Sequence, residues 1–300
     1  MAQAGSSYSF PDASLFKSKL IAPALHEIIT MKIHVSAEQI KSYRDNGFLA
    51  LPDFLDAREL RDWQRVTQEA VDQRLASQYG LTNQPSTGAE LGNDYYRRVF
   101  TQCLRLADTH AGMRKLIYAR SIGELMGQLA GVDDIRVWHD QALFKPPFGN
   151  PTSWHLDTPY WSFHSREALS IWIALDDATV ANGCMWYLPG THKSARYDNA
   201  GIGPNMGDLF QIYPEWAKLE AVAVPLPAGG AAIHNGLCAH AAGANMTPRP
   251  RRAMTCAYMP DGCTFNGVKN VLPTELFERL KPGDRLDDAQ QNPLVWSRNP

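Results

Sequence analysis

The sequence predicts a mainly β protein with flanking helices, arranged as an antiparallel sandwich or jelly roll. Helical periodicity is concentrated before residue 131, whereas short apolar runs separated by Gly, Pro and Asn follow it. Strands that succeed one another without helices between them favour antiparallel pairing over βαβ units. The chain has 300 residues and no internal repeat, so we expect one large domain.

Two capping-box pairs mark the starts of helices in the first third of the chain, Ser36 with Gln39 and Asp56 with Glu59. The first helix is expected to end at Gly47, because glycine adopts the left-handed conformation that closes a helix. A strand should follow at 48–51, and the second helix should end at Gly80.

The remaining elements follow from composition and periodicity. Residues 1–33 are weakly patterned and are expected to form an N-terminal extension, with residues 34–300 as a single domain. The polar stretch 81–93 is long enough to be a functional loop. Helical spacing returns at about 109–130. The strands expected after it are 135–144, 169–175, 185–188, 221–224, 230–234 and 253–259.

The composition excludes several classes of protein. The chain has 29 Lys and Arg against 31 Asp and Glu, a net charge of −2, so no basic excess favours nucleic acid. No run of 18 apolar residues predicts a membrane span. The five cysteines form no CxxC pair, which argues against a disulfide framework or a zinc ribbon. A reducing compartment and no signal-peptide pattern together favour a cytoplasmic location.

The segment WHLDTPYW at 154–161 carries the strongest chemical signal. His155 and Asp157 are two residues apart, so in an extended chain their side chains would share one face and bind one ion. This short pattern becomes informative when His240 supplies a third ligand. Two histidines and a carboxylate form the facial triad of non-heme Fe(II) oxygenases, although Zn²⁺ accepts the same donors. His234 competes with His240 for the third position.

Arg251 distinguishes iron from zinc, because an iron enzyme with a dicarboxylic co-substrate needs a cation for the second carboxylate. An arginine on the strand after the ligand turn can hold a carboxylate through two parallel hydrogen bonds. Neighbours on a strand face opposite sides, so only one of Arg251 and Arg252 points inward, and Arg249 shares the parity of Arg251. The alternative for this segment is a solvated basic edge strand.

In this order the motifs resemble the phytanoyl-CoA dioxygenase (PhyH) family of Fe(II)- and 2-oxoglutarate-dependent oxygenases. The resemblance extends over about residues 34–261, and it implies a double-stranded β-helix, the cupin-like jelly roll. The segments that carry it are the opening helix and strand at 36–55, the HxD at 154–157, the central stretches at 171–185 and 188–192, and the segment from His240 to Arg251.

The resemblance also implies roles for individual residues. It places Fe(II) on His155, Asp157 and His240, and the distal carboxylate of the co-substrate 2-oxoglutarate on Arg251, with O₂ as the second co-substrate. Two further family positions, one lining the co-substrate pocket and one contacting the co-substrate, fall on Trp172 and Gln141. A hydroxyl residue that the family has two positions after the distal histidine is replaced here by Ala242.

The implied function is a dioxygenase that hydroxylates a C–H bond of a small organic molecule in specialised-metabolite biosynthesis, releasing succinate and CO₂. The alternatives are an acyl-CoA hydroxylase of the same family, a Zn-dependent hydrolase or isomerase on the same barrel, and a non-catalytic binding protein. The aromatic residues of 154–161 and the absence of a basic cluster beside them favour a compact, ring-containing substrate over a CoA thioester. The sequence leaves the oligomeric state open.

Overall fold

The computed structural model describes residues 34–77 and 94–299, and every structural statement below concerns these parts of the chain. The expected N-terminal extension at 1–33, the expected helix end at Gly80 and the loop at 81–93 lie outside the described residues. None of the described helices is both long enough and apolar enough to cross a membrane.

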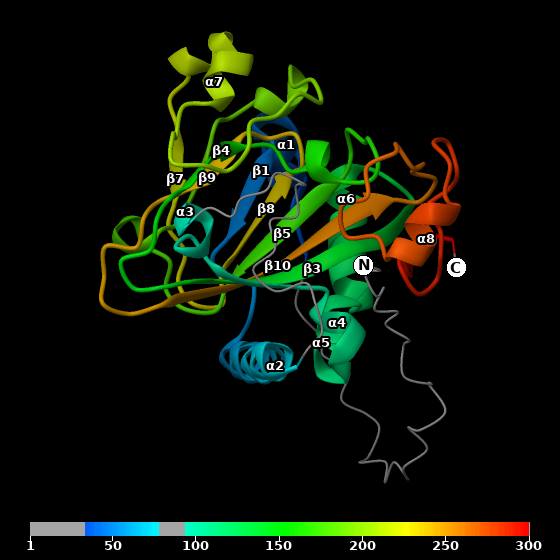
Figure 1. The fold of residues 1–300 in the computed structure, drawn as a ribbon, viewed down its shortest axis with the longest axis horizontal. Coiled ribbons are helices and arrows are strands. Elements are labelled where there is room, and N and C mark those ends of the chain that lie inside the picture. Colours follow the sequence, from blue (N-terminus) through cyan, green and yellow to red (C-terminus); the bar gives the residue numbers. More distant parts are fainter. Residues whose placement is uncertain (1–33, 78–93, 300) are drawn as a thin grey trace, which may run out of the picture.

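Two antiparallel sheets pack face to face and form the jelly roll that the sequence predicted (Figure 1). The larger sheet contains, in spatial order, β1 (Phe48–Leu51), β8 (Ala231–Asn235), β5 (Leu169–Ala174), β10 (Arg251–Pro260), β3 (Asp134–Lys145) and β11 (Leu294–Ser297), with β2 (Thr101–Leu104) also paired to β3. The smaller sheet contains, in spatial order, β4 (Thr152–His155), β9 (His240–Ala242), β6 (Met185–Tyr187) and β7 (Val222–Val224).

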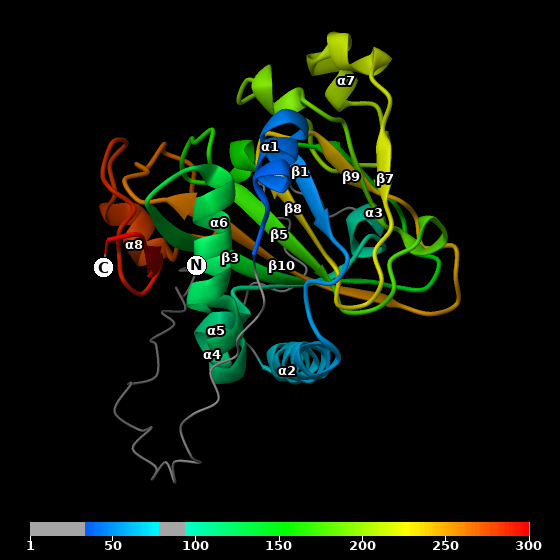
Figure 2. The same ribbon diagram turned by 180° about the vertical axis from the view of Figure 1, so that it is seen from behind.

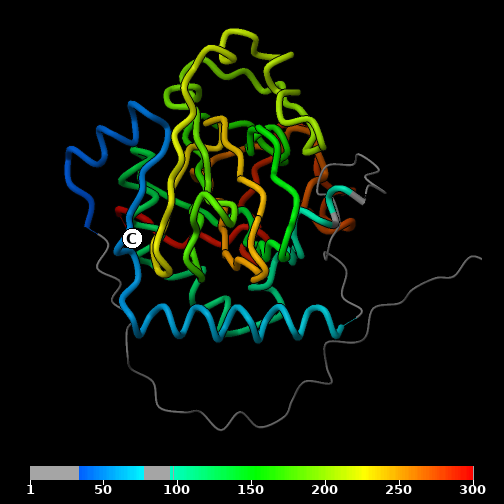
Figure 3. Tube along the Cα trace, turned by 90° about the vertical axis from the view of Figure 1, so that its left-hand side faces the viewer, coloured from blue at the N-terminus to red at the C-terminus, as the bar shows by residue number. Residues whose placement is uncertain are grey.

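Helices cover the outer face of the larger sheet, as the view from behind shows (Figure 2). Those on this face are α1 (Ala37–Asn46), α4 (Leu106–Thr109), α5 (Ala111–Ile117) and α6 (Arg120–Ala130). The other described helices, at the ends and edges of the two sheets, are α2 (Ala57–Ala76), α3 (Asp94–Arg97), α7 (Leu209–Ile212) and α8 (Thr274–Arg279). Figure 3 shows α2 along one end of the sandwich and the segment that contains α7 at the opposite end.

The helix boundaries follow the signals in the sequence. Both capping boxes form, and the backbone N–H of Ser36 donates to Gln39 Oε1 at 2.8 Å. Gly47 ends α1 with φ +84°, a conformation that other residues rarely adopt. A Cβ at Gly47 would lie 2.4 Å from His192 Nδ1, so glycine is also needed there for packing.

One face of the larger sheet packs against the helices, and the other lines a pocket. Side chains on its outer face, such as Ile135, Val137 and Ile171, pack against the helices in the main hydrophobic core. Side chains of the opposite parity, such as Trp172 next to Ile171 on β5, line a pocket between the two sheets. Because successive side chains of a strand alternate between faces, one strand serves both the core and the site.

Several elements differ from the expectation. The helical pattern at 109–130 is two helices, because the chain leaves the helical path at Tyr118 and Ala119. Four strands were not expected from the sequence, namely β2, β4, β9 and β11. They have three or four residues each and every one includes a polar residue, so none forms the uninterrupted apolar run that indicated the equally short β1, β6 and β7. The short helices α7 and α8 interrupt a region that was expected to contain strands alone.

Candidate active site

The pocket lies between the two sheets, and both sheets contribute side chains to it. From the larger sheet come residues of β2, β3, β5, β8 and β10, and from the smaller sheet residues of β4, β6 and β9 that include His155 and His240. All six residues singled out from the sequence line this pocket, namely Gln141, His155, Asp157, Trp172, His240 and Arg251.

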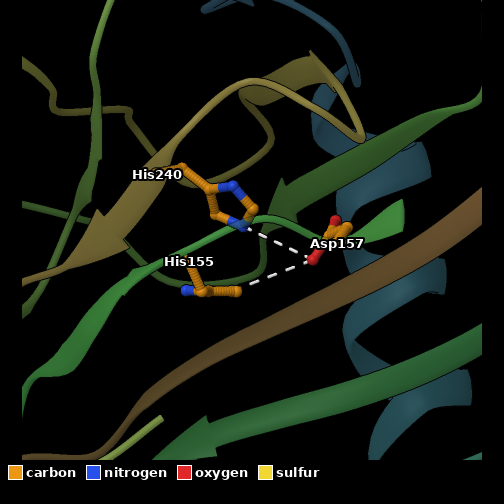
Figure 4. Close-up of side chains that lie close together, drawn as sticks. All are labelled: His155, Asp157 and His240. Carbon is orange, nitrogen blue, oxygen red and sulfur yellow. Dashed lines mark ion pairs between the residues drawn. The ribbon is translucent and has the colours of Figure 1, made fainter. Parts of the chain in front are cut away.

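Three potential metal ligands converge at one end of the pocket, which we call the metal end (Figure 4). His155 and His240 are directly opposite each other on β4 and β9, with ring centroids 4.2 Å apart. Asp157 Oδ1 lies 3.8 Å from His155 Nε2 and 3.5 Å from His240 Nε2. All three ligand atoms lie within 4.8 Å of one another, so one ion can contact them together. Two imidazoles and one carboxylate are the donor set of a facial Fe(II) site.

The local backbone differs from the extended chain that was expected between His155 and Asp157. Strand β4 ends at His155, and Asp157 has helical dihedral angles, φ −81° and ψ −51°. The backbone N–H groups of Asp157 and Thr158 both donate to Gly236 O at 2.9 Å, which fixes this turn. A Cβ on Gly236 would lie 2.2 Å from Thr158 Oγ1, so only glycine allows the approach. The two side chains therefore meet through a turn and not through strand alternation.

Each ligand histidine is oriented by a carbonyl two residues before it. His155 Nδ1 donates to Ser153 O at 2.8 Å, and His240 Nδ1 donates to Cys238 O at 2.9 Å. This leaves the lone pair of each Nε2 facing Asp157. Burial lowers the pKa of both imidazoles, so each is neutral and able to bind a metal.

The other carboxylate oxygen of Asp157 is held by His234 and Ser170. His234 Nε2 donates to Asp157 Oδ2 at 3.1 Å, Ser170 Oγ donates to the same oxygen at 2.8 Å, and Tyr187 Oη lies 3.2 Å from His234 Nδ1. Burial opposes ionisation of Asp157, but the surrounding histidines, His240 first, lower its pKa well below its usual range. His234 therefore faces the oxygen that is turned away from the three-ligand cluster.

Arg251 occupies the opposite end of the pocket, which we call the arginine end. Its side chain is fully buried, and none of its three guanidinium nitrogens has a hydrogen-bond partner among the described residues. The guanidinium carbon lies 5.0 Å from the ring centroid of Trp172 and 6.0 Å from that of Phe100. Burial lowers the pKa of Arg251 to about 10, so it is a cation at neutral pH. A buried cation with five unused donors fits a carboxylate.

The parity expected of the two neighbouring arginines is confirmed. Arg252 points out of the pocket, where Nη2 lies 2.8 Å and Nε 3.0 Å from the carboxylate of Asp176. Arg249 is exposed and precedes β10. Among these three arginines, only Arg251 lines the pocket.

Gln102 and Ser170 also line the pocket, and neither was singled out from the sequence. Gln141 Oε1 accepts from Gln102 Nε2 at 2.5 Å, and Gln102 Oε1 accepts from Tyr96 Oη at 3.0 Å, which joins β3, β2 and the segment before β2. Ser170 has the parity of Trp172 on β5, the one local signal that points it inward. Ala242 lines the pocket as well, without a hydroxyl group.

Two solved structures define the class of protein. The non-heme α-ketoglutarate-dependent carbocyclase SnoK from nogalamycin biosynthesis is 28% identical, with a TM-score of 0.72 over 89% of this chain and 98% of that one. The epimerase SnoN, solved with Fe³⁺, α-ketoglutarate and nogalamycin RO, is 26% identical, with a TM-score of 0.65 over 86% and 97% of the two chains. The protein is an iron- and 2-oxoglutarate-dependent oxygenase.

Sequence comparison identifies the family within this class. The model of the phytanoyl-CoA dioxygenase (PhyH) family matches residues 43–253. The dioxygenase lolE1 of Epichloe uncinata is 33% identical over 235 residues, which cover 75% of this chain and 82% of the relative. The chain belongs to the phytanoyl-CoA dioxygenase family, and the resemblance recognised in its motifs is confirmed.

Proposed function

We propose that His155, Asp157 and His240 hold Fe(II), and that Arg251 binds the distal carboxylate of 2-oxoglutarate. The observation that carries this proposal is the fully buried guanidinium with three unpartnered nitrogens in the same pocket as the three ligands. A buried cation without a counter-ion is costly, and a dianion that spans the pocket would remove that cost. The bound iron and 2-oxoglutarate supply the oxidising chemistry, while the chain positions them.

Trp172 and Gln141 are proposed to shape the co-substrate site between its two ends. Trp172 packs against the guanidinium of Arg251, and Gln141 is held in place by Gln102. These side chains fix the direction of the arginine and the width of the pocket. Residues 34–300 would act as one oxygenase domain, since the described elements from α1 to β11 pack around this pair of sheets.

The substrate is proposed to be an uncharged, ring-containing molecule that the enzyme hydroxylates. Among the described residues that line the pocket, the formal charges belong to Asp157 and Arg251, and both are assigned to iron and 2-oxoglutarate. Burial lowers the pKa of His139 to about 4, so this lining imidazole is neutral. The remaining lining includes Tyr160, Trp161, Thr255 and Asn270. An anionic substrate would lose its hydration there without gaining a counter-ion.

The test is succinate formation from 2-oxoglutarate with Fe(II), measured with a panel of candidate substrates. We expect Fe(II)-dependent succinate release, increased most by uncharged aromatic or alicyclic compounds and less by phosphonates or CoA thioesters. Succinate release with Fe(II) but none with Zn²⁺ would support the oxygenase over a zinc hydrolase. A higher kcat/KM for a CoA thioester than for every uncharged compound would overturn the proposed substrate class.

A further inference from the structure

A second buried basic residue, Lys145, is the strand partner of Arg251, although it is not itself among the described residues that line the pocket. The two residues are directly opposite each other on β3 and β10, so their side chains leave the same face of the sheet. Both are fully buried. Lys145 Nζ lies 4.5 Å from the ring centroid of Phe100, the ring against which Arg251 also lies, at 6.0 Å.

The surroundings hold Lys145 in place without neutralising it. Its side-chain nitrogen Nζ donates to the backbone oxygen of Asn150 at 2.6 Å. Its stem passes under Gly183, where a Cβ would lie 3.0 Å from Lys145 Cδ. Within the described parts of the chain, neither Lys145 nor Arg251 has a carboxylate within ion-pair distance. Two buried cations side by side without an anion are strongly unfavourable, so one of them gives up its proton.

Lysine is the residue that gives up the proton, because guanidinium holds its proton far more strongly. Burial, and then the charge of Arg251, lower the pKa of Lys145 to about 6. The titratable groups nearby do not offset this effect. Burial raises the pKa of Cys184, Tyr95 and Tyr96, so all three are neutral, and the carboxylate of Asp176 is paired with Arg252.

We propose that Lys145 is a second, proton-linked cation of the 2-oxoglutarate site. It is neutral while no anion occupies the arginine end, and it takes up one proton from solvent when a dicarboxylate binds beside Arg251. This inference rests on the role proposed above for Arg251. Its consequence is that 2-oxoglutarate binds more tightly as the pH falls through the range between the free and the bound pKa of Lys145.

The experiment is calorimetric titration of 2-oxoglutarate into the Fe(II)-loaded protein without O₂, in buffers of different ionisation enthalpy. At pH 8 we expect net uptake of up to one proton per 2-oxoglutarate in the wild type. We expect none in Lys145→Met, which keeps the unbranched chain without its terminal amine. Lys115→Met, at an exposed position on α5, is the matched control and should behave as the wild type.

The affinities give a second readout. Between pH 7 and pH 9 the wild-type Kd should rise by up to roughly tenfold per pH unit, whereas that of Lys145→Met should stay flat. The two curves should converge at high pH, where the lysine is neutral in both states. Lys145→Arg carries a permanent charge, so it should bind 2-oxoglutarate without proton uptake. This variant tests the same role if Lys145→Met does not fold.

The outcomes separate this inference from the proposed function. Equal proton uptake in the wild type and in Lys145→Met, or no uptake and a flat Kd in the wild type, would overturn the role of Lys145. If Arg251→Ala leaves the affinity for 2-oxoglutarate unchanged, the proposed function itself is refuted. Loss of affinity in Arg251→Ala together with wild-type pH dependence in Lys145→Met would refute the lysine proposal alone.

Discussion

At the metal end of the pocket the polar side chains already form hydrogen bonds with one another and with the backbone, whereas at the arginine end the guanidinium has no hydrogen bond to any residue that the structure describes. His155 and His240 are each anchored by a carbonyl, and Asp157 Oδ2 receives two hydrogen bonds. Arg251 is more deeply buried than Asp157, yet its nitrogens have no hydrogen-bond partner in the described parts of the chain. The ligand side chains at the metal end are therefore oriented before an ion binds. At the arginine end, the charge of the guanidinium is balanced only when an anion binds.

This difference implies that substitutions at the two ends of the pocket affect different binding steps. Damage at the metal end should change iron binding, because several groups together hold the ligand atoms in place. Damage at the arginine end should change the affinity for 2-oxoglutarate and leave iron binding intact. The variants below test whether the two ends are separable in this way.

The largest effect is expected from His240→Ala. Loss of a residue that merely orients a ligand typically costs 10–100-fold in metal affinity, so loss of a ligand should lower iron affinity and activity by more than roughly a hundredfold. Iron retained after desalting and succinate formation are the measurements. His164→Ala, which removes an exposed imidazole, is the control. If His240→Ala keeps iron while His234→Ala loses it, the ligand assignment is wrong.

Arg251→Ala should weaken 2-oxoglutarate binding and leave iron binding unchanged. Removing one partner of a buried charge pair costs about 2–5 kcal/mol, which corresponds to a roughly 30- to several-thousand-fold loss of affinity. Arg251→Lys should recover only part of this loss, because lysine lacks the planar pair of donors. The measurement is a titration of 2-oxoglutarate, with Arg252→Ala as the outward-facing control. A large loss in the control and none in Arg251→Ala would contradict the assignment.

At the arginine end, the direction of Arg251 could be predicted from the sequence because it depends only on alternation within one strand. Alternation along β10 places Arg251 and Arg252 on opposite faces, and the structure has them so. Lys145 was not singled out, because its position beside Arg251 depends on the register between β3 and β10. Register between strands more than 100 residues apart leaves no local pattern.

The three side chains that converge at the metal end were singled out from the sequence, but the backbone that brings them together was not predicted. The expected strand face between His155 and Asp157 is a turn that is fixed by Gly236, a residue about 80 positions away. The turn is not visible in the segment itself. His234 and Ser170 come from neighbouring strands of the larger sheet, so their meeting at Asp157 also depends on register.

His234→Ala tests whether the metal end owes its geometry to the groups around Asp157. Without the hydrogen bond to Oδ2, the carboxylate should be less well oriented, and the affinity for Fe(II) should fall by about 10–100-fold. The affinity for 2-oxoglutarate of the iron-loaded variant should change little, because Arg251 is intact. Competition with a chelator gives the iron affinity. A change confined to 2-oxoglutarate binding would contradict the separation of the two ends.

The smallest effect is expected from Ser170→Ala, which removes the second hydrogen bond to Asp157 Oδ2, 2.8 Å long. A hydrogen bond to an ionised group contributes about 1.5–3 kcal/mol, and because His234 still bonds to the same oxygen we expect the lower limit, a roughly tenfold loss of Fe(II) affinity. Since both residues orient one carboxylate, the double variant Ser170→Ala/His234→Ala should show an effect different from the sum of the two single effects. Ser42→Ala, on the exposed face of α1, should leave the affinity unchanged. Strict additivity would mean that the two residues act on iron binding by separate routes, and the metal end would then not be one coupled unit.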